Sequence, residues 1–160
     1  MNFLGPKLLC FFTILALVLS CNDDPLPDVA PQLSYTGISK TEMFQGAINS
    51  DTLYIFLEFS DGNGDIGGQN SKNIIVIDKR TDERYDSFSL PDLPQSKDGV
   101  NGQIVVRLFT TCCIFPENIP PCEAPSAFPV NELLLEIHLR DEAGNESNRV
   151  LTDPITLLCQ

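Results

Sequence analysis

The sequence is poor in positive charge, histidine and tryptophan. Its 160 residues include 10 Lys and Arg against 22 Asp and Glu, one histidine and no tryptophan, which gives a net charge of −12. A nucleic-acid-binding surface needs clustered Lys and Arg to neutralise phosphates, so this charge argues against a nucleic-acid partner. It would also repel anionic lipid headgroups, and membrane attachment therefore needs something other than a basic patch.

Motifs of the common catalytic families are missing as well. The sequence has no G-x-S-x-G, no H-E-x-x-H and no glycine-rich phosphate loop. His138 stands without an evident nucleophile, and Asp141 and Glu142 are adjacent turn residues rather than carboxylates that face each other across a cleft. We therefore expect that the protein is not an enzyme.

Residues 1–20 have the pattern of a cleaved secretory signal peptide. Lys7 is followed by an apolar run over residues 8–19, which is too short to cross ~30 Å of hydrocarbon as a helix. Residues 18–21, Val-Leu-Ser-Cys, resemble the lipobox of bacterial lipoproteins. The resemblance implies that Cys21 receives a diacylglyceryl group and further acylation such as palmitate, and that the protein is anchored in the outer membrane. The alternative is an ordinary signal peptide followed by a disulfide cysteine.

Residues 21–32 form a tether rich in proline and aspartate. Pro25, Pro27 and Pro31 favour an extended polyproline-like conformation. The acidic residues at 22–24 resemble the tag that sends some outer-membrane lipoproteins to the cell surface, whereas the alternative is a solvated spacer.

Residues 33–160 show the two-residue periodicity of β-strands. Apolar and polar positions alternate over residues 53–59 and 133–139, and shorter runs occur at 33–40, 73–79, 84–90, 103–109 and 149–158. Turn-forming residues separate these runs, and no long stretch has helical spacing. The pattern predicts an all-β domain, an immunoglobulin-like β-sandwich of about seven antiparallel strands, with His138 on the outward side of its strand.

Two turns carry a resemblance that supports this fold. Residues 141–145, Asp-Glu-Ala-Gly-Asn, resemble the last hairpin of many bacterial immunoglobulin-like domains. Residues 59–67 resemble a turn of small, mostly uncharacterised bacterial lipoproteins with such a domain. The resemblance implies an architecture and leaves the ligand open.

Acidic residues of three loops are expected at one end of the domain. If the strands run alternately up and down, the loop after 53–59, the connection 91–102 and the turn at 141–147 share an end. Their hard oxygen donors suit Ca²⁺, which takes 6 to 8 oxygen ligands. The predicted ligands are Asp61, Asn63, Asp65, Asp141 and Glu142, with Asp98 and Asn145 nearby. The alternative is that these residues only form turns.

Four cysteines are expected to form disulfides at the opposite end. An exported chain meets an oxidising compartment, and Cys112, Cys113, Cys122 and Cys159 are left once Cys10 and Cys21 are set aside. One member of the adjacent pair is expected to join Cys159, and the other to join Cys122. A vicinal bond between Cys112 and Cys113 would be strained, and the spacing is not one that zinc sites favour.

Residues 110–130 form a long, proline-rich loop. Five prolines and a disulfide argue against disorder, and Phe115, Ile119 and Phe128 give the loop apolar side chains. These side chains either form a recognition surface or fold back as a lid over the core.

Together these features predict a lipid-anchored, non-enzymatic binding or accessory module of the bacterial cell envelope. The expected partner is a protein or a glycan, recognised through the loop at 110–130. The alternative is a structural subunit of an outer-membrane complex. Bound Ca²⁺ is the only cofactor that the sequence suggests.

Overall fold

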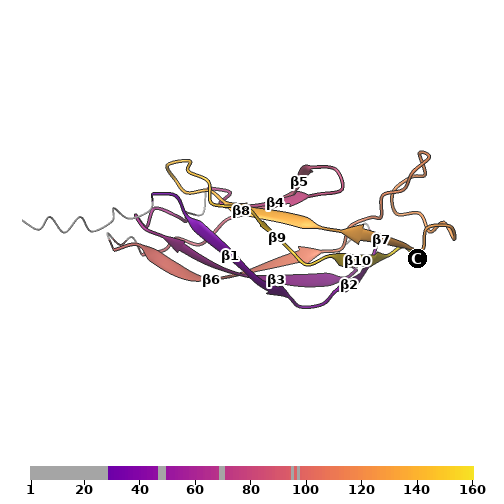
Figure 1. Cartoon of the computed structure of the whole chain (residues 1–160), viewed down its shortest axis with the longest axis horizontal. Coiled ribbons are helices and arrows are strands. Elements are labelled where there is room, and N and C mark those ends of the chain that lie inside the picture. The colour runs from indigo at the N-terminus through magenta and orange to yellow at the C-terminus, as the bar shows by residue number, and fades with distance from the viewer. Residues whose placement is uncertain (1–28, 47–49, 69–70, 95, 97) are drawn as a thin grey trace, which may run out of the picture.

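The structure is a computed structural model that describes residues 29–46, 50–68, 71–94, 96 and 98–160 (Figure 1). The predicted signal peptide, Cys21 and the tether as far as residue 28 lie outside these residues. The described residues form ten strands and no helix. Consequently, none of them belongs to a helix long and apolar enough to cross a membrane. The prediction of an all-β domain is confirmed for the described residues.

The strands form three sheets. Sheet A has the order β1-β3-β6, with β1 at Gln32–Ile38, β3 at Thr52–Asp61 and β6 at Val100–Phe109. Sheet B has the order β2-β10-β7, with β2 at Glu42–Phe44, β10 at Ile155–Leu158 and β7 at Val130–Leu133. Sheet C has the order β5-β4-β8-β9, with β5 at Glu83–Phe88, β4 at Ile74–Asp78, β8 at Leu135–Leu139 and β9 at Val150–Leu151. Every pair of neighbours is antiparallel except β2 and β10, which are parallel.

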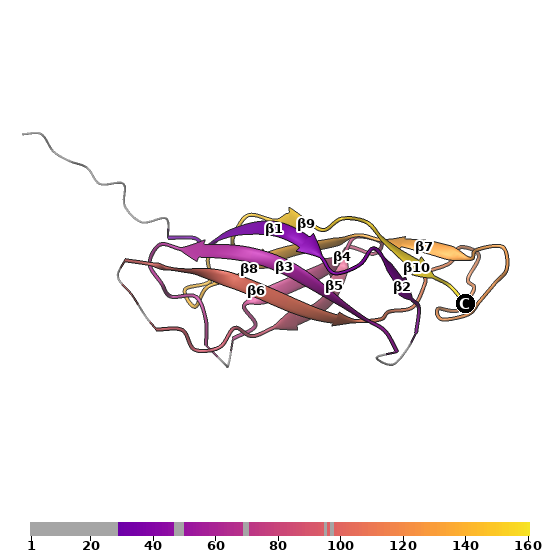
Figure 2. The same cartoon turned by 90° about the horizontal axis from the view of Figure 1, so that it is seen from below.

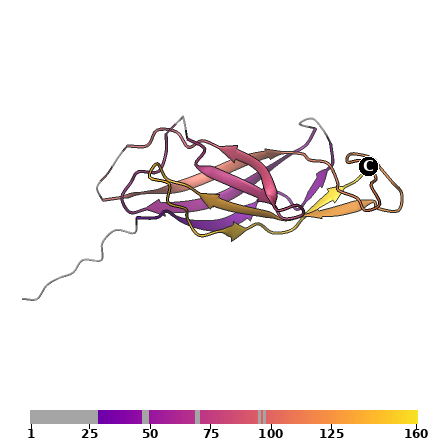
Figure 3. The ribbon, with the colours of Figure 1, turned by 90° about the horizontal axis from the view of Figure 1, so that it is seen from above.

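The core lies between sheets A and C, which face each other across the molecule (Figures 2 and 3). On β3, Leu53, Ile55 and Leu57 are at most 1% exposed, whereas Tyr54 and Phe56 on the other face are 41% and 39% exposed. This is the alternation that the sequence predicts, and burying each Leu or Ile stabilises the fold by roughly 1.5–3 kcal/mol. Sheet B extends the same core with Met43, Leu133 and Leu157.

The strand count differs from the expected seven for three local reasons. The run predicted at 149–158 is divided into β9 and β10 around Pro154, which has no N–H to donate to a ladder. The chain also changes sheets at Leu134, because β7 pairs with β10 and β8 pairs with β4. The three-residue strand β2 was too short for its periodicity to be recognised.

The prediction that His138 lies on the surface is wrong. His138 is only 3% exposed, although it occupies the outward position of β8 beside Ile75 of β4. The His138 side chain lies among charged side chains that interact with it. They form ion pairs with one another, Arg140 with Glu146 at 2.5 Å and Arg149 with Glu136 at 2.7 Å. Burial and the charge of Arg149 lower the pKa of His138, and Glu146 acts in the opposite direction.

The molecule is elongated, and the two ends carry different chemistry (Figure 1). Val29, the first described residue, lies at one end, where its carbonyl oxygen is 3.5 Å from the side-chain amide of Asn145. The C-terminus and the loop at 110–130 lie at the other end. We call these the acidic end, formed by residues 61–68, 91–94, 96, 98–99 and 141–145, and the cysteine end, formed by residues 110–130, Phe44, Gln45 and Cys159.

Candidate functional site

Three loops meet at the acidic end, as the alternating strand directions predict. The backbone N–H of Glu142 donates to the carbonyl of Asp65 at 3.2 Å, which joins the 141–145 turn to the loop after β3. A side chain at Gly64 would come within 2.6 Å of the carbonyl oxygen of Ser96, so that loop also packs tightly on the connection before β6. Gly64 has a φ of 68°, which glycine adopts without strain.

Asp61, Asp65 and Asp141 form the inner part of this end. Asp61 and Asp141 are 2% and 4% exposed. Oδ2 of Asp61 accepts a hydrogen bond from the N–H of Ile66 at 2.9 Å, and both carboxylate oxygens of Asp141 accept bonds from Asn145 at 2.7 Å. Burial raises the pKa of Asp61, and the neighbouring charges of Asp65 and Asp141 raise it further, against the opposing effect of the Ile66 hydrogen bond.

The other predicted calcium ligands, Asn63 and Glu142, lie on the surface of this end, as does Asp98. The carboxylate of Glu142 lies over Gly68, 2.9 Å from where a Cβ of that residue would be. Beside it is a cavity of about 190 Å³ lined by residues 64–68, Asp92, Leu93 and Glu142. Among the described residues, no three acidic, histidine or cysteine side chains are placed to share one metal ion. The five predicted ligands therefore do not form one ready-made site.

Asn73 links the loops of the acidic end and was not singled out by the sequence. Its side chain is fully buried. The amide nitrogen donates to the carbonyls of Gly67 at 3.1 Å and Arg140 at 3.2 Å, and the amide oxygen accepts from the N–H of Leu90 at 3.1 Å. One side chain thus satisfies three backbone groups from three segments. The sequence around Asn73 does not indicate these hydrogen bonds, because the groups that it bonds belong to other segments of the chain.

Two disulfides shape the cysteine end. Cys112 is bonded to Cys122, with a Cα–Cα distance of 4.6 Å, and Cys113 is bonded to Cys159, with a Cα–Cα distance of 6.0 Å. This is the arrangement predicted from the sequence. The first bond closes a short loop within residues 110–130, and the second fixes the start of that loop to the end of β10.

Hydrogen bonds from outside the loop hold it at further points. The Gln45 side chain accepts from the N–H of Cys113 at 3.0 Å and donates to the carbonyl of Glu123 at 2.6 Å. The Arg80 guanidinium, paired with Asp78 at 2.6 Å, donates to the carbonyl of Cys112 at 3.2 Å. The loop is therefore attached to the turn after β4 and to the residue after β2, as well as to β10.

The apolar loop residues that the sequence predicts for recognition are half-buried. Phe115 packs against the core and lies 6.2 Å from Phe128 between ring centroids, and Ile119 is also partly covered. For Phe115 this agrees with the lid alternative. The exposed apolar side chains at this end are instead Phe44, Ile114 and Val130, at 50%, 39% and 53%.

Phe44 and Val130 belong to one row across sheet B. Both are register partners of Leu158, Phe44 from β2 and Val130 from β7, so the three side chains lie on the same face of the sheet. Ile114 is not part of this row. Its N–H and carbonyl bond at 3.3 and 3.1 Å to the side chain of Asn131, which lies on the other face of sheet B because it follows Val130 in β7. We call Phe44, Val130 and Leu158 the apolar row.

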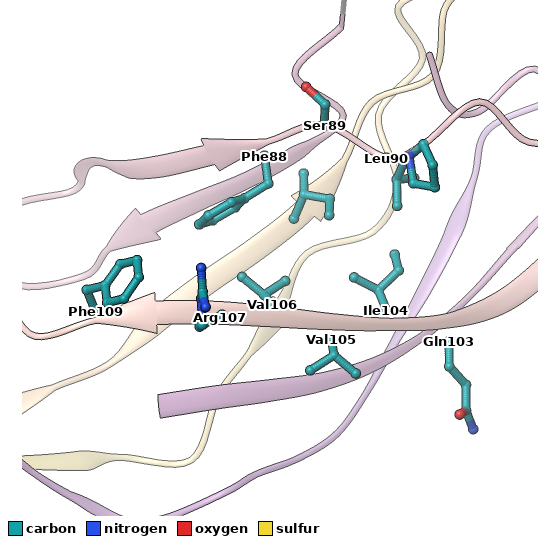
Figure 4. Close-up of a pocket in the computed structure, with 11 residues that line it drawn as sticks. Phe88, Ser89, Leu90, Gln103, Ile104, Val105, Val106, Arg107 and Phe109 are labelled. Atoms are coloured by element: carbon teal, nitrogen blue, oxygen red, sulfur yellow. The ribbon is translucent and has the colours of Figure 1, made fainter. Parts of the chain in front are cut away.

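A separate groove runs between the edge strands β5 and β6 (Figure 4). Its volume is about 410 Å³, within the range of small-ligand sites. Phe88 reaches from β5 toward β6, and Ile104 and Val106 point into the groove while Val105 lies on the other face of β6. The Tyr85 hydroxyl donates to the carbonyl of Phe109 at 2.6 Å and bridges the two strands. The groove was not predicted, because alternation identifies buried faces and not which strands become edges.

Comparison with known proteins finds no matching family, no similar curated protein and no similar solved structure.

Proposed function

We propose that this protein is a lipid-anchored, non-enzymatic binding module of the bacterial outer membrane, and that it recognises a protein or glycan partner through the cysteine end. We also propose that its domain is an immunoglobulin-like sandwich, in which sheets A and C are the two main layers. The observation that carries the functional proposal is the attachment of the loop at 110–130. Two disulfides, Gln45 and Arg80 hold a loop that adjoins exposed apolar side chains.

Rigid attachment favours binding because the surface loses little conformational entropy when a partner docks. The apolar row supplies contiguous area to bury, and exposed patches of this kind mark interaction sites in soluble domains. The orientation of the domain relative to its anchor also supports recognition through the cysteine end. Val29 lies at the acidic end, so an anchor attached before it leaves the cysteine end pointing away from the membrane.

A second candidate function is that of a structural subunit in an envelope complex. The observation in its favour is β6, an edge strand of ten residues that pairs only with β3 within its sheet. Val105 on this strand is 57% exposed and faces its register partner Phe56. A β-strand of a partner protein could extend sheet A along this edge.

Lipid attachment is tested by replacing Cys21. Because acyl chains supply the membrane affinity in this proposal, Cys21→Ala is expected to abolish incorporation of labelled palmitate and to move the protein out of the membrane fraction. Cys10→Ala is the matched control, since Cys10 lies within the predicted signal peptide, and it should keep the label. Palmitate retained in the Cys21→Ala protein would exclude the anchor.

Recognition is tested by photo-crosslinking in intact cells. A benzophenone side chain placed at Val130 is expected to give one discrete adduct, and the same group at Val105 is expected to give none. Replacing Phe44 with serine should reduce the Val130 adduct at least tenfold, which corresponds to about 1.4 kcal/mol of binding energy. An adduct at Val105 alone would instead favour the structural-subunit function and would contradict recognition through the cysteine end.

A further inference from the structure

Three aspartates are grouped at the acidic end. Asp61, Asp65 and Asp141 lie close enough to interact electrostatically. In the part of the chain that the structure describes, none of the three forms an ion pair with Lys, Arg or His. Carboxylates taken out of water are normally paired or bound to a metal, because burial without compensation is costly.

Two carboxylate oxygens at this end have no hydrogen-bond partner. Oδ1 of Asp61 and Oδ1 of Asp65 are both buried, and neither accepts a bond from any described group. Asp61 is 2% exposed, and the bond from Ile66 to its other oxygen fixes the orientation of the carboxylate. The chain therefore presents a buried, oriented oxygen ligand and leaves it unsatisfied.

Each of the two aspartates lines a cavity of about 190 Å³, and the two cavities are separate: Asp61 lines one together with Asp98, and Asp65 lines the other. The cavity at Asp65 is also lined by two further acidic residues, Asp92 and Glu142. These acidic side chains suit hard cations and their bound water. Anions would be repelled by the same lining.

We propose that Asp61 and Asp65 bind a calcium ion at the acidic end. Calcium accepts 6 to 8 oxygen ligands in flexible geometry, so backbone carbonyls and water can complete a set that begins with two carboxylates. Asp141 adds charge without being a required ligand, which is consistent with the lack of a preformed group of three. A site with so few charged ligands belongs to the weak extracellular class, with a Kd on the order of 10⁻⁴–10⁻³ M.

Binding there would stabilise the junction of the three loops rather than the cysteine end. The ion would offset the repulsion among Asp61, Asp65 and Asp141, and these residues come from the loop after β3 and from the 141–145 turn. The site does not depend on the apolar row or on partner recognition. Either proposal can therefore fail without the other.

The test measures thermal unfolding of the full-length protein in detergent, after EDTA treatment and dialysis, with added CaCl₂. With the expected affinity, 10 mM Ca²⁺ should raise the folding equilibrium constant by about 10- to 100-fold and increase Tm. Equilibrium dialysis with ⁴⁵Ca²⁺ should give one ion per chain. NaCl at equal ionic strength should not reproduce the shift.

Variants identify the ligands. Asp61→Asn and Asp65→Asn should each abolish the calcium-dependent rise in Tm, and Asp86→Asn, a change at an exposed residue of β5 outside the acidic end, should keep it. Two substitutions are used so that failure of one to fold leaves the other decisive. The proposal is overturned if wild-type protein shows no rise with Ca²⁺, if NaCl gives the same rise, or if either folded ligand variant retains it.

Discussion

Replacing Cys113 and Cys159 together with alanine is expected to lower the free energy of unfolding by about 4 kcal/mol. The disulfide joins residues 46 positions apart, so its removal frees a long closed loop in the unfolded chain. The two cysteines are 0% and 2% exposed. Alanine is apolar, so the replacement removes the bond without placing a polar group in the core. The bond is also the covalent link between the loop at 110–130 and β10, and its loss should loosen both.

Urea unfolding followed by circular dichroism measures this loss. The matched control is the Cys112→Ala, Cys122→Ala double variant, whose bond spans only 10 residues and should cost about 3 kcal/mol or less. Reducing the wild-type protein should reproduce the combined effect. If the Cys113 and Cys159 replacement costs no more than the control, the long-range disulfide is not the main covalent stabilisation of the domain.

The same comparison separates stability from recognition. The short bond between Cys112 and Cys122 constrains the loop itself, whereas the bond from Cys113 to Cys159 attaches that loop to the domain. In the proposed function, breaking the short bond should weaken partner binding more than it weakens folding. This follows because a loop that must be ordered on binding reduces affinity without exposing the core.

The sequence predicts the fold best for strands that bury one face and expose the other, because apolar and polar residues then alternate along the strand. On β3, one face packs into the core and the other remains accessible, so the polar and apolar positions reproduce the burial observed. The direction of successive strands also predicts correctly that residues 61–68 and 141–145 meet at one end. Both arguments need only local periodicity and strand length.

Predictions fail where the packing of individual side chains decides the environment. His138 occupies an outward position and is nevertheless buried, because ion-paired side chains of residues 136–149 lie around it. For Phe115 the sequence left two alternatives open, and its packing on the core agrees with the lid. Alternation cannot decide either case, since it does not show which side chains will cover an outward position or where a loop will pack.

Asn73 is a buried residue that no sequence motif distinguishes. Asn73→Ala is expected to lower the free energy of unfolding by about 3 kcal/mol or more, because each buried group left without a partner costs about 1–3 kcal/mol. The groups are the carbonyls of Gly67 and Arg140 and the N–H of Leu90. No other residue type offers an amide donor and an acceptor on a side chain of this length.

The effect is measured by urea unfolding against Asn63→Ala, an exposed asparagine of the same end that should change stability by less than about 0.5 kcal/mol. Asn73→Asp serves as a second comparison. It keeps the shape and the acceptor for Leu90 but loses both donor bonds, and it adds a buried carboxylate to an end that already contains Asp61 and Asp141. Its loss should therefore equal or exceed that of alanine. A cost below about 1 kcal/mol for either variant would mean that the three loops are held together chiefly by their backbone contacts, such as the bond from Glu142 to Asp65, and not by Asn73.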